Sequence, residues 1–125
     1  MTALPITSLT AAIFGIMLVF LGLYAGLGRV KTNISLGTEG SDMLLKRVRA
    51  HGNFTEYAPI GLIVLALCEY GGKSTNMLWA IAGALIIGRI FHAIGLYTEI
   101  LIFRSSGMLM TLISILTGSA LLLWP

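Results

Sequence analysis

Long apolar stretches constrain this chain more than any other feature of its sequence. The first 28 residues hold no charged side chain, and a helix over residues 4–27 is long enough to cross about 30 Å of hydrocarbon. Charged residues make up only 10% of the 125-residue chain, against about 25% in soluble domains. A soluble domain of this size could not bury so much apolar surface in one core. We therefore expect an all-α integral membrane protein.

Polar, glycine-bearing segments divide the chain into four predicted membrane spans. Residues 29–41 and the segment "GGKST" are typical of loops, and Ser41 or Asp42 can cap the helix that follows. The predicted spans are residues 4–27, 42–70, 75–97 and 106–124. Together they predict one four-helix transmembrane bundle over residues 1–125. Because no Lys or Arg precedes the first span, we expect no cleavable signal peptide.

The basic residues are distributed unequally between the predicted loops. The second loop holds only Lys73. The first and third loops and their flanks hold Arg29, Lys31, Lys46, Arg47, Arg49 and Arg104. The positive-inside rule then places the first and third loops in the cytoplasm and both termini on the opposite side.

A polar stripe enters the second predicted span. Lys46, Arg49, Asn53 and Glu56 are spaced by three, four and three residues and fall within an arc of about 80° on a helix. Anionic lipid headgroups would explain the basic residues, but they would not explain Asn53 and Glu56. Because Glu56 lies about one turn inside the apolar zone, it should have a partner. Two further residues of this segment are expected to face headgroups or solvent, namely Arg47 and His51.

Arg89 lies in the middle of the third predicted span. An Arg at that depth costs about 2.5–3.5 kcal/mol on insertion scales, so it should face the bundle interior. Its long side chain can extend toward the cytoplasmic side, and we predict that it pairs with Glu56 or shares a polar network with it. The candidate site then comprises Arg49, Asn53, Glu56, Tyr57, Arg89, His92, Tyr97 and Arg104. Cations outnumber carboxylates in this set, which favours an anionic or zwitterionic small molecule beside a lipophilic one.

Small residues recur at helical spacing in three of the predicted spans, where they let helices approach closely. They are Gly15, Gly22 and Gly26 in the first span, Ala80, Ala84, Gly88 and Gly95 in the third, and Gly107, Thr111, Ser114 and Gly118 in the fourth. The pattern favours packing within one bundle, and packing between subunits stays open as the alternative.

Two segments of the sequence resemble the MAPEG family, the membrane-associated proteins in eicosanoid and glutathione metabolism. In "RAHGNFTEYAP" an Arg49–Ala50 pair is followed by Asn53 and then by Glu56, as in the signature of the family's second helix. The segment "RIFHAIGLY" is similar to the family's third helix, and four spans in 125 residues fit the whole chain.

This resemblance implies a homotrimer of four-helix subunits in a bacterial inner membrane, similar to the microsomal glutathione transferases. It implies glutathione as a co-substrate between subunits near the cytoplasmic face. Arg104 would be the catalytic residue, since a nearby cation favours the nucleophilic thiolate. The thiolate would attack a lipophilic electrophile or reduce a lipid hydroperoxide. The residues implied to bind glutathione are Lys46, Arg49, Asn53, Glu56, Tyr57, Arg89, His92 and Tyr97.

The sequence departs from the family in places and leaves other functions open. Gly52 stands where some relatives carry a further Arg, and either Leu96 or Tyr97 could face the site.

A non-catalytic protein that binds glutathione or lipid is the alternative to an enzyme. A four-helix drug transporter would need a carboxylate in the first span, which has none. The expected partners are glutathione, a lipophilic small molecule and membrane lipid, with no nucleic acid and no metal site, since Cys68 is the single cysteine.

Overall fold

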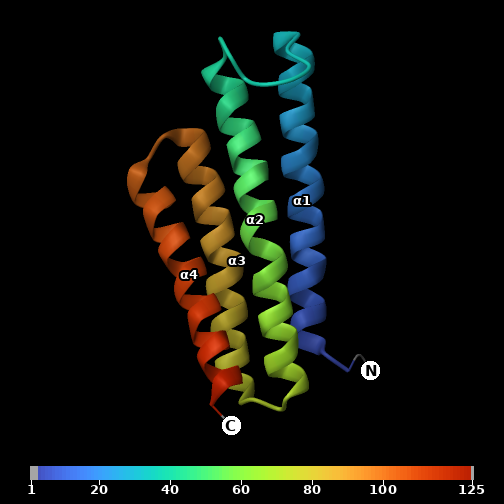
Figure 1. Cartoon of the computed structure of the whole chain (residues 1–125), viewed down its shortest axis with the longest axis vertical. Coiled ribbons are helices and arrows are strands. Elements are labelled where there is room, and N and C mark those ends of the chain that lie inside the picture. The colour runs from blue at the N-terminus through green and yellow to red at the C-terminus, as the bar shows by residue number, and fades with distance from the viewer. Residues whose placement is uncertain (1–2, 125) are drawn as a thin grey trace.

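The computed structural model describes residues 3–124 and folds into long antiparallel α-helices (Figure 1). They are α1 (Pro5–Thr32), α2 (Asp42–Tyr70), α3 (Thr75–Thr98) and α4 (Leu101–Leu123). The predicted all-α bundle is confirmed over this range. Pro5 begins α1, where its missing N–H costs nothing, and the Ser41 hydroxyl caps α2 by accepting from Leu44 N at 3.2 Å.

The connection between α3 and α4 is shorter than the sequence predicts. We expected the fourth helix to begin at residue 106, but α4 begins at Leu101, directly after Glu99 and Ile100. Glu99 has φ 61° and ψ 15°, a left-handed conformation that ends α3 and turns the chain within two residues. Arg104 therefore lies in the first turn of α4 and is held by a helix.

Three of the helices are long and apolar enough to cross a membrane, namely α1, α3 and α4. The second helix has 29 residues, so its length is sufficient, but it carries Lys46, Arg47, Arg49 and Glu56 in its first half. Its passage through the membrane stays a prediction. It lies alongside the other helices over most of their length (Figure 1).

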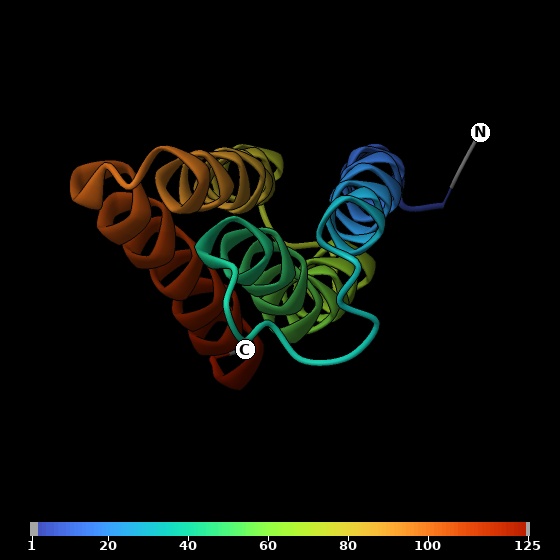
Figure 2. The same cartoon turned by 90° about the horizontal axis from the view of Figure 1, so that it is seen from above.

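The second helix is the centre of the bundle and contacts α1, α3 and α4. Viewed from above, α1 and α4 lie on opposite sides of it (Figure 2). The apolar core includes an edge-to-face contact between Phe14 and Phe54, with ring centroids 5.3 Å apart. The α1–α2 hairpin extends past the α3–α4 turn (Figure 1), so one flank of α2 is left uncovered above that turn.

Small residues bring α3 and α4 into close contact. A Cβ added to Gly88 would lie 2.7 Å from Thr111 Oγ1 and 2.8 Å from Gly107 O, and one added to Gly95 would meet the Arg104 backbone. These stripes thus serve packing within the chain. On α1, by contrast, an added Cβ at Gly15 or Gly26 would have no neighbour within 4 Å in the described chain.

Candidate functional site

An open groove of about 560 Å³ lies where α2 passes the α3–α4 turn. It is lined by Leu45, Lys46, Arg49, Asn53, His92, Gly95, Leu96, Glu99, Leu101 and Arg104. This set brings together residues that we had selected from three separate helices: Lys46, Arg49, Asn53, His92 and Arg104. The groove therefore presents cations from α2 and α4, an amide from α2 and an imidazole from α3, with apolar side chains between them.

Arg89 lies below the groove and is only 2% exposed. Its Nη1 donates to Asn53 Oδ1 at 2.6 Å and its Nε donates to Thr111 Oγ1 at 2.9 Å. The guanidinium carbon also lies 5.3 Å from the centroid of the Tyr57 ring. Nη2 has no hydrogen-bond partner among residues 3–124. The buried cation is thus held by neutral dipoles and an aromatic face.

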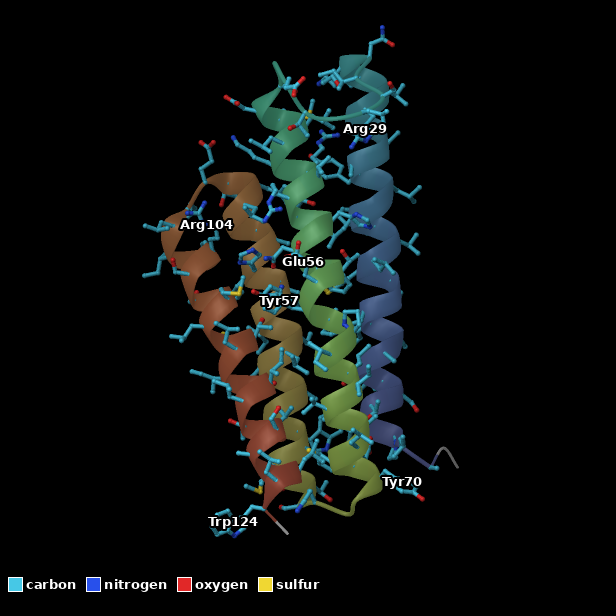
Figure 3. All side chains as sticks on the ribbon, viewed as in Figure 1. Arg29, Glu56, Tyr57, Tyr70, Arg104 and Trp124 are labelled. Carbon is cyan, nitrogen blue, oxygen red and sulfur yellow. The ribbon has the colours of Figure 1, made fainter. Side chains whose placement is uncertain are left out.

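The predicted pairing of Arg89 with Glu56 is wrong within the described chain. Asn53 and Tyr57 lie one helical turn apart and both face Arg89. Glu56 is rotated by about 100° from Tyr57, and it is exposed. Figure 3 shows Glu56 and Tyr57 midway along α2, with Arg104 nearer the α3–α4 turn. The polar stripe therefore has a buried edge, which includes Asn53, and an exposed edge, which includes Glu56.

His92 and Arg104 are joined through the backbone. His92 Nδ1 lies 3.0 Å from the carbonyl oxygen of Arg104, and because a carbonyl can only accept, Nδ1 carries the proton. This bond fixes the first turn of α4 to α3, beside the close contact at Gly95. The Arg104 side chain is exposed and free to extend.

Arg104 also borders a second groove of about 460 Å³. This groove is lined by His92, Arg104, Ser105, Met108, Leu109 and Leu112. The second groove exposes mainly apolar surface, whereas the first groove exposes polar and apolar surface in similar amounts. Arg104 and His92 thus line both grooves and lie at the boundary between them.

Tyr97 lies outside the first groove, and Leu96 lines it instead. The Tyr97 ring packs edge-to-face on Tyr24 of α1, with centroids 5.3 Å apart.

The prediction that Arg47 and His51 face headgroups or solvent is wrong. Arg47 stacks 3.7 Å above the Tyr24 ring and donates to Tyr24 O at 3.1 Å, and His51 lies against Gly22 of α1. Both side chains join α2 to α1.

Glu99 is a groove residue that reasoning from the sequence missed. Its carboxylate forms an ion pair with Lys46 across the rim. Hydrogen bonding and charge attraction from Lys46 lower the pKa of Glu99. The sequence could have indicated this role through the position of Glu99, which follows the third span directly and faces the start of the polar stripe.

Within residues 3–124, no three His, Cys, Asp or Glu side chains gather as metal ligands would.

Comparison with known proteins identifies the family of the chain. The MAPEG family model matches residues 7–124. The inner membrane protein YecN of Escherichia coli K12 is 30% identical over 96 residues, which cover 77% of this chain and 73% of YecN. The YecN protein of Escherichia coli O6:H1 matches to the same extent. No solved structure matches the chain. The chain belongs to the MAPEG family.

Proposed function

We propose that this protein is a glutathione-dependent transferase or peroxidase of a bacterial inner membrane. The observation that carries the proposal is the groove in which Lys46, Arg49, Asn53 and Arg104 converge. Membership of a family of glutathione and eicosanoid metabolism supports the choice of ligand, and an inner-membrane relative supports the location.

The groove suits the charges of glutathione. That tripeptide has two carboxylates and one ammonium group, and planar guanidinium groups bind carboxylates with two parallel hydrogen bonds. Arg49 and Lys46 stand on the α2 side of the groove and Arg104 on the α4 side. Because basic residues gather at this end of the bundle, the positive-inside rule places the groove toward the cytoplasm, where glutathione is available.

Arg104 is the proposed catalytic residue. Its guanidinium would stabilise the glutathione thiolate, which is the nucleophile. The apolar groove on its other side would hold the lipophilic partner. The sulfur would then attack an electrophilic carbon, forming an S–C bond while the leaving group departs with its electron pair, such as the chloride of 1-chloro-2,4-dinitrobenzene. With a hydroperoxide the sulfur would attack the terminal oxygen, so that an S–O bond forms, the O–O bond breaks and the alkoxide leaves as the alcohol after taking up a proton. A second glutathione would then reduce the sulfenic acid, giving glutathione disulfide and water. His92 orients the Arg104 backbone through its 3.0 Å hydrogen bond.

Exposed charge on α2 supports assembly of the site between subunits of a homotrimer. Glu56 is exposed on the same helix as Ile60 and Ile63, which are 46% and 54% exposed. A carboxylate that faces lipid beside such residues is costly. A neighbouring subunit would cover this edge, and Glu56 would there meet the ammonium group of glutathione. Tyr57 would support Arg89 beneath this edge, while Tyr97, which packs on Tyr24, would act only through the contact between α3 and α1.

The proposal is tested on detergent-purified protein. Glutathione binding is measured by calorimetry, and turnover with 1-chloro-2,4-dinitrobenzene and with cumene hydroperoxide. Arg49→Ala should weaken binding, and Arg104→Ala should lower turnover more than binding. Lys31→Ala removes an exposed cation outside the groove and should change neither. Absence of binding at millimolar glutathione contradicts the proposal, and binding without turnover selects the non-catalytic alternative.

A further inference from the structure

Glu99 is the one acidic side chain that lines the groove within the described part of the chain. Lys46, Arg49 and Arg104 supply the cations. Of these, Lys46 is paired with Glu99, while the guanidinium groups of Arg49 and Arg104 have no hydrogen bond or ion pair to residues 3–124. An anion that enters the groove thus meets two available guanidinium groups and one ammonium group that is already engaged.

The backbone fixes Glu99 at the rim. The residue adopts a left-handed conformation, with φ 61°, in the two-residue turn between α3 and α4. Close packing of Gly95 on the Arg104 backbone holds both sides of that turn in place. The carboxylate is therefore presented toward Lys46 from a rigid support, although its side chain is 68% exposed to solvent.

An exposed ion pair of this kind is weak enough to be exchanged. Such pairs contribute little net free energy because water screens both partners. A carboxylate of a bound ligand can replace Glu99 on Lys46, and Glu99 then returns to solvent. The exchange lowers the net affinity by the strength of the pair that is given up.

We propose that Glu99 is an internal competitor for the ligand carboxylate at Lys46, and that this competition sets the affinity of the groove for anionic ligands. The inference rests on the proposed function for the identity of the ligand as glutathione. The competition itself needs only an anion that reaches Lys46. Glu99 is thus a specificity-determining residue that favours ligands able to displace it.

The decisive experiment is a double-mutant cycle with glutathione. Glu99→Gln should tighten binding about threefold to fivefold in the otherwise unchanged protein and leave it unchanged in the Lys46→Met background. Glu39→Gln is the matched control, because Glu39 is an exposed acid of the α1–α2 loop that does not line the groove. An equal gain in glutathione affinity in both backgrounds would show that the negative charge of Glu99 acts at long range and does not compete for Lys46. Weaker binding by Glu99→Gln would show a direct contact with the ligand. Either result overturns the proposal.

A second measurement separates this inference from the proposed function. Acylation of Lys46 in ligand-free protein is followed by mass spectrometry, with Lys31 and Lys73 as internal references. Glu99→Gln should raise the reactivity of Lys46 alone, and inorganic sulfate should protect Lys46 at a lower concentration in that variant. These readouts need no glutathione site. Unchanged reactivity and unchanged protection of Lys46 would overturn the inference even if glutathione binds.

Discussion

Nη1 of Arg89 lies 2.6 Å from Oδ1 of Asn53, and this bond joins the buried middle of α3 to the floor of the groove. Because a guanidinium group only donates, the amide of Asn53 must turn its oxygen toward Arg89. The amide nitrogen then faces the groove as a donor. One buried cation thereby fixes what the groove offers to a ligand.

Two substitutions of Asn53 should separate stability from binding. Asn53→Leu leaves the buried guanidinium without this acceptor and should lower the free energy of unfolding by about 1–3 kcal/mol. Asn53→Asp gives Arg89 a carboxylate partner, so thermal stability should stay close to that of the unchanged protein. The same change replaces a donor by a negative charge in the groove, and glutathione affinity should fall at least tenfold. Thermal unfolding in detergent and calorimetry measure the two effects, and tight binding by Asn53→Asp would contradict the assigned amide orientation.

Thr111 should contribute to stability through its hydroxyl. Its Oγ1 accepts from Arg89 Nε at 2.9 Å and donates to Gly107 O at 2.9 Å. Thr111→Val keeps the shape but removes the acceptor, and should cost about 1–3 kcal/mol. Thr111→Ser keeps the hydroxyl and is the control, with a smaller loss from one missing methyl group. Equal unfolding midpoints for Val and Ser would show that the hydrogen bond contributes little.

Much of this arrangement was accessible from the sequence because it follows from single helices. The apolar runs predicted the helices, and the cost of a mid-span cation predicted that Arg89 is buried. The partner of Arg89 depends instead on how α2 is rotated and shifted against α3. A rotation of one residue, about 100°, decides whether Asn53 or Glu56 faces the guanidinium. Spacing within α2 fixes their relative angle but not which of them points at α3.

The hydrophobic pattern of the sequence also did not predict where the helices end or how neighbouring helices contact each other. The left-handed conformation of Glu99 ends α3 and lets α4 begin as early as Leu101. Glycine is the usual residue in that conformation, so its absence from this turn hid the turn in the sequence. Arg47 resembled a headgroup ligand because it is basic and near an interface. Its stacking on Tyr24 depends on the distance between α1 and α2, which Gly28 permits by leaving room for the Arg47 side chain.

Glycine substitutions on α3 should distinguish tight packing from open space. A Cβ at Gly88 would come within 2.8 Å of both Thr111 Oγ1 and Gly107 O. Gly88→Ala should therefore force α3 and α4 apart and destabilise the protein by about 1–3 kcal/mol. A Cβ at Gly83, on the same helix, has no neighbour within 4 Å, so Gly83→Ala should be neutral or slightly stabilising. Thermal unfolding of the two variants compares them, and similar losses would contradict the predicted close contact.

The ion pair at the groove rim should be visible in a pH titration. Lys46 lowers the pKa of Glu99, so the ordinary value of about 4.3 should return in Lys46→Met. The folded state binds this proton less readily than the unfolded chain. The pair therefore stabilises the fold above the unfolded pKa and loses that contribution as pH falls through the folded pKa. Carbon-13 NMR of the Glu side chains measures the shift, with Glu39 as the reference. An unchanged Glu99 pKa in Lys46→Met would contradict the ion pair.

The opposite end of the bundle depends on Glu69, which caps a helix from outside. Its carboxylate accepts from the backbone N–H groups of Ile6 at 2.9 Å and Thr7 at 2.7 Å, where the dipole of α1 favours negative charge. Glu69→Ala removes both bonds and should cost about 0.5–2 kcal/mol. Glu69→Gln keeps one acceptor, so its stability should lie between that of the unchanged protein and that of Glu69→Ala. Hydrogen exchange of the Ile6 and Thr7 amides should follow the same order, Ala fastest and Glu slowest. Because the groove lies at the far end, glutathione affinity should not change in either variant, and a parallel loss of affinity would show that Glu69 supports the whole bundle instead of one helix end.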